Sequence, residues 1–184
     1  MGMFDDSLDE ALASKVTRPA PKSAPARMRY LVRQLKGTRP VAELLGVSQR
    51  TVERYVKDQI KRPRPDLAAR LAAEVRRRWQ PRVRERARKQ AATSTGIVIE
   101  TRARFGFSAA PGSTDDARVR LITHHLPPVY AARLFEARTQ GATDQELRTI
   151  AAEGLQEEYF KDRGRRAAGL AVEFTDVDYV EFDI

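Results

Sequence analysis

Residues 38–57, TRPVAELLGVSQRTVERYVK, constrain the fold more than any other stretch of the chain. Ala42 is small enough to let two helices approach closely, and Gly46 suits a turn that needs a positive φ angle. Val52 follows six residues later and points back into the core from a second helix. The other apolar positions of this face are Val41, Leu45, Val47 and Tyr55. With Ser48 as a suitable N-cap for the second helix, the pattern predicts a helix-turn-helix.

The second helix of this motif presents polar and basic side chains to solvent. A helix with such residues at its N-terminal end fits the major groove of DNA. The residues predicted to bind DNA are Ser48, Gln49, Arg50, Thr51, Arg54 and Lys57. The alternative is an ordinary helical hairpin with a charged, solvated face.

Basic residues concentrate in one part of the chain, which has 184 residues and a formal net charge of +9. Residues 27–92 hold 20 basic and 6 acidic side chains, whereas residues 93–184 hold 11 basic and 15 acidic ones. Residues 1–26 are close to neutral, with 3 basic and 4 acidic side chains. This layout favours a nucleic-acid-binding module joined to a separate, mildly acidic interaction domain.

The composition excludes several classes of protein. Because the chain contains no cysteine, it has neither a disulfide framework nor a cysteine-based zinc site. No apolar run approaches the length of a transmembrane helix, and the first residues, MGMFDDSLDEALASKV, lack the hydrophobic region of a secretory signal. We therefore expect a cytoplasmic protein that associates with the nucleoid and not with a membrane.

Helices are expected on both sides of the helix-turn-helix. Residues 5–16 predict a short acidic helix, and residues 17–26, rich in Pro, Ala and Ser, predict a flexible linker. Helical periodicity then starts near Arg27 and ends at Gly37, a suitable C-cap. The buried stripe of this helix is Met28, Leu31 and Leu35.

A basic hinge and an arginine-rich helix follow the motif. The prolines of residues 61–65, KRPRP, forbid a continuing helix, and a longer helix begins at Asp66. Its apolar face is Leu67, Leu71, Val75 and Trp79. After an interruption at Pro81, RVRERARK has almost no apolar content. We interpret it as an arm that follows the DNA backbone, a solvated charged helix being the alternative. Phosphate contacts are expected from Lys61, Arg62, Arg64, Arg76, Arg77, Arg82 and Arg84.

Beyond residue 93 the periodicity changes from helical to alternating. One face of a first strand carries Ile97, Ile99, Thr101, Ala103, Phe105 and Phe107, and the other carries Glu100, Arg102 and Arg104. A second strand is expected to place Ala117, Val119, Leu121 and Thr123 on one face, with Arg118 and Arg120 outward. Two helices follow, at about 128–139 and 144–162, the second with a capping box formed by Thr143 and Glu146. Residues 170–184 predict a third strand or hairpin.

The predicted fold class is α+β, with a helical helix-turn-helix domain followed by a small α+β domain of ββααβ type. Residues 1–26 are assigned to an N-terminal segment and linker. Residues 27–92 are assigned to the DNA-binding domain with its arginine-rich extension, and residues 93–184 to the α+β domain.

Other polar groups carry weaker signals. His124 and His125 are adjacent on an expected strand, so they point to opposite faces and make a poor metal chelate; we interpret them as structural or phosphate-facing. The acidic stretch from Glu173 to Asp183 is either an ordinary surface strand or an edge that pairs with a partner protein or with a second copy in a homodimer. Without a nucleophile and base pair, a phosphate loop or a carboxylate dyad, we expect no enzyme and no cofactor or metal of its own.

The combination of length, basicity, helix-turn-helix and the loop PGSTDD at residues 111–116 resembles the terminal proteins that cap telomeres of linear Streptomyces-type chromosomes and plasmids. The resemblance covers essentially the whole chain, although its helix-turn-helix alone is generic. It implies a protein that becomes covalently joined to the 5′ end of DNA through a hydroxyl that primes the first nucleotide. It also implies two partners, a telomere-associated protein on the single-stranded 3′ overhang and a DNA polymerase.

The resemblance assigns the priming hydroxyl to Thr114. Such a hydroxyl needs an exposed loop, and the polymerase's divalent metal ions activate it, so the protein needs no catalytic base. Ser, Thr, Asp and Gly also gather in loops for conformational reasons alone. The alternative hydroxyls are those of Ser113, Tyr130, Tyr159 and Tyr179. Asp115 and Asp116 are expected to cap the loop, with help in seating a metal as the alternative.

Two other functions compete with protein priming. A helix-turn-helix regulator of transcription, or of plasmid replication or copy number, would use the α+β domain to dimerise or to bind an effector, and would protect an internal palindrome. A nucleic-acid-processing enzyme is disfavoured because no catalytic constellation stands out in the sequence.

Overall fold

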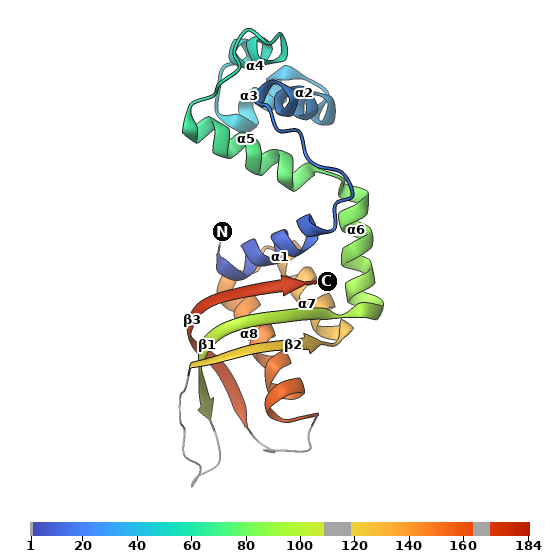
Figure 1. Cartoon of the computed structure of the whole chain (residues 1–184), viewed down its shortest axis with the longest axis vertical. Helices are drawn as coiled ribbons and strands as arrows, with labels where there is room; N and C mark the ends of the chain where they lie inside the picture. The colour runs from blue at the N-terminus through green and yellow to red at the C-terminus, as the bar shows by residue number, and fades with distance from the viewer. Residues whose placement is uncertain (1, 109–118, 164–169) are drawn as a thin grey trace. The chain divides into compact units, whose positions relative to one another are not determined.

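The computed structural model describes residues 2–108, 119–163 and 170–184, which form a mixture of helices and a three-stranded antiparallel sheet (Figure 1). This agrees with the expected α+β class. The chain divides into two compact units. One is Val16–Pro81, called the basic unit below, and the other, the sheet unit, combines Met1–Lys15 with Arg82–Ile184.

Helices pack around a small apolar core in the basic unit. They are α2 (Ala24–Leu35), α3 (Thr38–Leu45), α4 (Gln49–Val56) and α5 (Pro65–Arg78). The core includes Met28, Leu31, Val41, Leu45, Val52 and Leu71, all fully buried. These side chains recur every three or four residues, so each helix turns one apolar stripe inward. The buried positions expected in α3 and α4 are therefore confirmed.

The connection between α3 and α4 is short and fixed by local chemistry. Gly46 adopts a left-handed conformation with φ of +59°, which costs glycine little because it has no Cβ. The backbone N–H of Val47 then donates to the carbonyl of Ala42 at 3.0 Å. Ser48 caps α4 by accepting from the Thr51 backbone N–H at 3.2 Å, as its position predicted.

The segment expected to be a flexible linker is tied to the end of α5. The backbone N–H of Thr17 donates to the Gln80 side chain at 2.9 Å, and Trp79 Nε1 donates to the carbonyl of Arg18 at 2.8 Å. The next helix, α2, begins at Ala24 and so occupies the end of the supposed linker. Composition alone missed these contacts because their partners are about sixty residues away in the sequence.

The sheet unit is built on β1 (Ile97–Ser108), β2 (Val119–Leu126) and β3 (Ala171–Asp183), in the order β2-β1-β3. Helices α7 (Pro128–Thr139) and α8 (Asp144–Leu155) cover one face of the sheet (Figure 1). The side chains of β1 that face these helices are Ile97, Ile99, Thr101, Ala103 and Phe105, all buried as predicted. The capping box of Thr143 and Glu146 at the start of α8 is also as predicted.

Helix α1 (Met3–Ser14) belongs to the sheet unit, not to a separate N-terminal segment. The ring of Phe4 packs edge-on against Phe174 and Phe182 of β3, with centroids 5.6 and 6.1 Å apart. Asp144 accepts the backbone N–H groups of Phe4 and Asp5 at 2.8 and 3.1 Å. The division also differs from the expected one at residues 82–92, which lie with the sheet. Both differences have one cause, since α1 completes a core whose other parts come after residue 82.

The side chains of β2 point to the opposite faces of the sheet from those expected. Ile122 and Leu126 are buried, whereas Leu121 and Thr123 are exposed. Pairing sets this choice, because Thr101 lies opposite Ile122 and Ile97 opposite Leu126, and residues opposite each other share a face. Arg120 consequently points toward the helices, with its guanidinium 5.8 Å from the ring centre of Phe160.

Further helical segments lead into the sheet and out of α8. Helix α6 (Pro81–Gln90) continues into the π-helix η1 (Ala91–Thr95), and α8 continues into the π-helix η2 (Gln156–Phe160). Within the ranges that the structure describes, no helix has the length and apolar character needed to cross a bilayer.

Candidate nucleic-acid interface

Two basic side chains of α4 and that of Lys57, its C-cap residue, stand in a row on the exposed side of the helix. Arg50, Arg54 and Lys57 are separated by four and three residues, a spacing that puts them on one helical face. All three are exposed, and no carboxylate in the described part of the chain pairs with any of them. Val52 and Tyr55 occupy the opposite, buried side of α4. These three residues, called the α4 basic face, therefore carry positive charge that the fold leaves uncompensated.

The polar residues at the start of α4 are engaged within the protein. Gln49 Nε2 donates to Thr38 Oγ1 and to Glu53 Oε1, both at 3.0 Å. The hydroxyls of Ser48 and Thr51 lie 2.8 Å apart. The bond from Gln49 to Thr38 joins the first turn of α3 to the first turn of α4, and the other bonds lie within α4 and its N-cap. Ser48, Gln49 and Thr51, which were predicted as DNA contacts, thus also position the helix that carries the basic face.

Positive charge continues beyond α4 into the segment that leads to α5. Lys61, Arg62 and Arg64, called the basic segment, are exposed. Residues 61–64 are not helical, because Pro63 cannot continue a helix and Pro65, which opens α5, disfavours the helical conformation at Arg64. The basic unit as a whole holds 17 basic and 5 acidic side chains, whereas the sheet unit holds 17 basic and 20 acidic ones. The positive field of the protein therefore comes from the basic unit.

The arginines at the end of α5 lie beside an acidic residue of the same helix. Arg76 and Arg77 are exposed, as their predicted role requires. Arg77 Nη1 lies 3.6 Å from Glu74 Oε1, and Arg78 also pairs with Glu74. Glu74 thus offsets part of the positive charge on this turn.

Arg82 and Arg84 were both expected to contact DNA, but the structure separates them. Arg82 is exposed, whereas Arg84 is 8% exposed and its Nη2 lies 2.6 Å from Asp9 Oδ1 of α1. Asp9 also accepts from Arg138 at 3.1 Å. Although burial raises it, the positive charges of Arg84 and Arg138 and their hydrogen bonds lower the pKa of Asp9 below its ordinary value. The assignment of Arg84 to DNA binding is corrected, because its guanidinium holds α6 to α1.

Thr114, with Ser113, Asp115 and Asp116, lies outside the described residues. The three tyrosines that were alternatives to Thr114 are described. Tyr179 donates its hydroxyl to Glu100 Oε1 at 3.0 Å, and Tyr130 is partly buried with its ring 5.7 Å from the guanidinium carbon of Arg133. Tyr159 is the most open of the three, with 41% of its surface exposed.

The two histidines point to opposite faces of β2, as predicted. His124 lies on the side of the helices, where its ring contacts that of Tyr159 with centroids 5.7 Å apart. Burial lowers the pKa of His124 below its ordinary value, despite the nearby Glu158 carboxylate. His125 is exposed, and its Nε2 lies 2.6 Å from the carbonyl of Thr95. Nowhere in the described residues do three His, Asp or Glu side chains gather in a way that could hold a metal ion.

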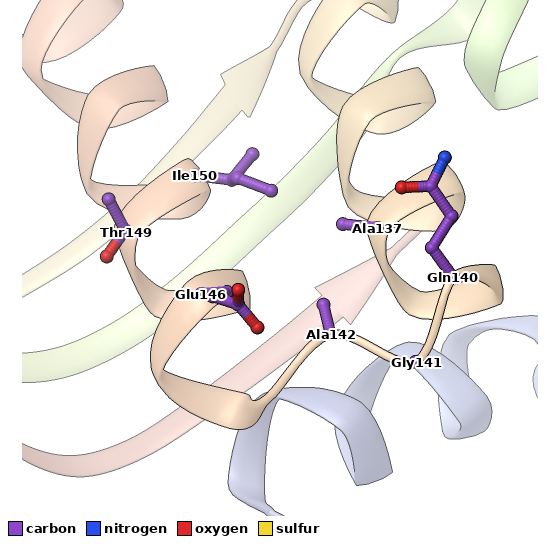
Figure 2. A pocket seen from close by; sticks show the side chains of 7 residues that line it. All are labelled: Ala137, Gln140, Gly141, Ala142, Glu146, Thr149 and Ile150. Atoms are coloured by element: carbon purple, nitrogen blue, oxygen red, sulfur yellow. The ribbon is translucent and has the colours of Figure 1, made fainter.

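A groove of about 500 Å³ lies where α7 ends and α8 begins (Figure 2). It is lined by Ala137, Gln140, Gly141, Ala142, Glu146, Thr149 and Ile150. Glu146 accepts from the backbone N–H and the hydroxyl of Thr143 at 2.6 and 2.9 Å, and these bonds lower its pKa. The carboxylate of Glu146 therefore caps α8 at the edge of this groove.

The α4 basic face and the basic segment together are the strongest candidate interface in the described residues. They are exposed and lie next to each other in the chain, and the unit that carries them has a large positive charge. Comparison of the chain with protein-family models, with curated proteins and with solved structures gave no match.

Proposed function

We propose that the basic unit binds DNA by inserting α4 into the major groove, as the second helix of a helix-turn-helix formed by α3 and α4. The observation that carries this proposal is the row of Arg50, Arg54 and Lys57 on the face of α4 opposite its buried residues. Arginine can hydrogen-bond two acceptors of a guanine at once, and lysine can reach the same acceptors or a phosphate. A helix anchored on one side and basic on the other can approach DNA without disturbing its own core.

The basic segment supports the same mode of binding. Lys61, Arg62 and Arg64 are exposed and follow α4 after a short connection, which supports contacts to phosphates on a strand that borders the groove. Such contacts release counterions from the DNA, and affinity then falls steeply as salt rises. In this proposal the α4 basic face reads bases, and the basic segment supplies salt-dependent affinity.

Single alanine substitutions test this division of roles. Arg50→Ala and Arg54→Ala should each weaken binding to the preferred DNA sequence by about 1–3 kcal/mol, with a smaller effect on unrelated DNA. Arg62→Ala should weaken both DNAs alike and lower the slope of log affinity against log salt by about one. Fluorescence anisotropy with the full chain over a range of salt concentrations measures all three quantities.

Arg133→Ala is the matched control, because Arg133 is exposed on α7 of the sheet unit and its loss changes the net charge equally. It should leave DNA affinity unchanged within error. If Arg133→Ala weakens binding as much as Arg54→Ala does, overall charge and not the α4 basic face governs the interaction.

On the strength of the resemblance described above, we further propose that the protein is a telomere terminal protein that caps linear DNA and primes synthesis at its ends. The Thr114 hydroxyl attacks the α-phosphate of a nucleoside triphosphate, an ester bond forms to the 5′ phosphate, and pyrophosphate leaves. A partner DNA polymerase supplies the divalent metal ions that activate the oxygen and stabilise the displacement. A telomere-associated protein on the 3′ overhang is the second expected partner. The chain itself acts as primer and not as the enzyme.

Mass spectrometry of protein purified from cells and treated with nuclease tests the priming proposal. A nucleotide adduct is expected on Thr114 and is expected to disappear in Thr114→Ala, whereas Ser113→Ala should keep it. DNA affinity of Thr114→Ala should equal that of the wild type. Absence of an adduct from the loop at residues 108–116 and from every tyrosine would contradict the priming proposal. DNA binding would still stand, and the result would favour a transcriptional or replication regulator, which would protect an internal palindrome instead.

A further inference from the structure

Arg64 occupies the N-cap of α5, where helix stability favours a different kind of residue. Ser23, Ser48 and Thr143 cap α2, α4 and α8 through their hydroxyls. Arg64, in contrast, makes no side-chain cap bond. The N-terminus of a helix also carries partial positive charge, which disfavours a cation there. The stability of α5 therefore does not explain this arginine, and residues that break a local rule are often functional ones.

The guanidinium of Arg64 has no ionic partner in the part of the chain that the structure describes. The residue is exposed, and no carboxylate there pairs with it, not even that of Asp66 in the first turn of α5. The positive charge of Arg64 is therefore available to an anionic ligand outside the chain.

The backbone that carries Arg64 is held in place. Arg64 has φ of −63° and ψ of 152°, an extended, polyproline-like conformation, and it lies between Pro63 and Pro65. Its carbonyl accepts the backbone N–H of Ala68 at 2.9 Å. Leu67 of the first turn is buried in the apolar core of the basic unit. An arginine on such a backbone loses only side-chain freedom when it binds a ligand.

The connection from α4 to α5 (Figure 1) limits how far Arg64 can lie from the α4 basic face. Ile60 packs against the apolar core, so the connection is anchored before the basic segment begins. Arg64 follows Lys57 of the α4 basic face by seven residues, which span at most about 25 Å. With α4 in the major groove, the first residues of the basic segment meet the bordering phosphates. The groove beyond that strand is the minor groove, which is about 6 Å wide.

We propose that Arg64 enters the minor groove beside the site read by α4, and that it makes the protein prefer a narrow, A·T-rich groove there. A narrow minor groove has enhanced negative potential, and it suits arginine because a guanidinium is more weakly hydrated than an ammonium. Pro63 and Pro65 offer no N–H to a phosphate, so recognition at this point falls to the Arg64 side chain. Lys61 and Arg62 keep their phosphate contacts. Insertion of Arg64 rests on the proposed DNA binding by α4 and is independent of priming.

Selection from a library of duplexes with a randomised centre tests the proposal, with the full chain as wild type, Arg64→Lys and Arg62→Lys. The wild type should select a run of A·T pairs next to the site that α4 reads. Arg64→Lys keeps the charge but should lose this run, whereas Arg62→Lys, the matched control, should keep it. A wild type that binds DNA without selecting the run overturns this proposal alone, and so does a run that survives in Arg64→Lys. A wild type that binds no duplex overturns the proposed DNA binding as well.

Base replacement identifies the groove that is read. In the selected duplex, the A·T pairs of the run are replaced by inosine·cytosine or by G·C. Inosine lacks the amino group that guanine places in the minor groove, so inosine·cytosine resembles A·T in the minor groove and G·C in the major groove. Affinity measured by fluorescence anisotropy should survive inosine·cytosine and fall about tenfold with G·C. Equal losses with both replacements would mean major-groove readout and overturn the proposal.

Arg64→Ser separates binding from stability. Serine can cap α5 and removes the cation from the helix N-terminus, so the basic unit should unfold at a temperature about 4 °C higher than in the wild type. The same variant should lose the preference for the A·T run. A lower unfolding temperature in Arg64→Ser would show that the arginine serves the fold, and would overturn the proposal.

Discussion

An ion pair with Asp9 gives Arg84 a structural role within the arginine-rich segment. Arg84 is held by Asp9 in a nearly buried pair, so Arg84→Ala should lower the free energy of unfolding of the sheet unit by about 3 kcal/mol. We place the effect at the low end for a broken buried pair because Arg138 still contacts Asp9. Arg82→Ala, an exposed change on the same helix, should cost less than about 0.5 kcal/mol. Urea unfolding of both variants measures the difference, and equal stability would show that the pair contributes nothing.

His124 gives the stability of the sheet unit a dependence on pH. Because burial lowers its pKa in the folded state, the folded protein favours the neutral imidazole. This contribution to stability is fully present above the unfolded pKa of about 6.5 and is lost as the pH falls through it toward the lower, folded pKa. Urea unfolding of His124→Gln should therefore lose less stability between about pH 7 and pH 5 than the wild type does. His125→Gln is the control, and a wild-type slope in His124→Gln would contradict the assignment.

Some residue assignments could be predicted from local sequence and others could not. Ser48 and Gly46 act through neighbours within five residues, so their roles follow from the pattern alone. Local sequence does not distinguish Arg84 from its exposed neighbours, because its partner, Asp9, is distant in the sequence. The sequence left open which face of β2 is buried, because both faces carry apolar residues. Only the pairing with β1 determines that Ile122 is buried and Leu121 is exposed.

At the scale of elements, the cap of α4 is the most direct test of the α3–α4 connection. The Ser48 hydroxyl accepts the Thr51 backbone N–H, a bond that alanine cannot replace. Ser48→Ala should destabilise the basic unit by about 1 kcal/mol, and Ser48→Thr should recover most of that loss because threonine also caps helices. Thermal unfolding followed by circular dichroism measures both. If threonine proves as damaging as alanine, the hydroxyl is not what stabilises the first turn.

The helices and strands themselves were largely predictable, because their boundaries are set by nearby residues. Helix α7 begins and ends at the expected residues, and the capping box at Thr143 marks the start of α8. The packing of α1 against β3 was not predictable from nearby residues. Its helical pattern indicated a helix, but Phe4 finds its aromatic partners at Phe174 and Phe182, near the other end of the chain.

At the scale of the molecule, the basic unit is inserted between α1 and the rest of the sheet unit. Its two ends are joined by the bonds of Thr17 to Gln80 and of Trp79 to Arg18. A fragment of residues 16–81 should therefore fold alone, show helical circular dichroism, unfold cooperatively and bind DNA with the salt dependence of the full chain. A fragment that is unfolded at low temperature would show that the basic unit depends on the sheet unit.

Phe4→Ala in the full chain is the complementary experiment. Loss of a fully buried phenylalanine should cost the sheet unit about 3–5 kcal/mol, while the basic unit keeps its stability and its DNA affinity. Unfolding should then occur in two separated transitions. A single cooperative transition for both units would contradict their independence.

The insertion also determines which proteolytic cuts can release a unit from the rest of the protein. One cut in either connecting segment opens the chain but releases no unit, because the other connection is still covalent. A cut between Lys15 and Ser23 would leave α1 as a short separate peptide, which Phe4 and Leu8 would still anchor in the apolar core of the sheet unit. Nicked molecules would therefore stay assembled until denatured, and only cleavage of both segments would set the basic unit free.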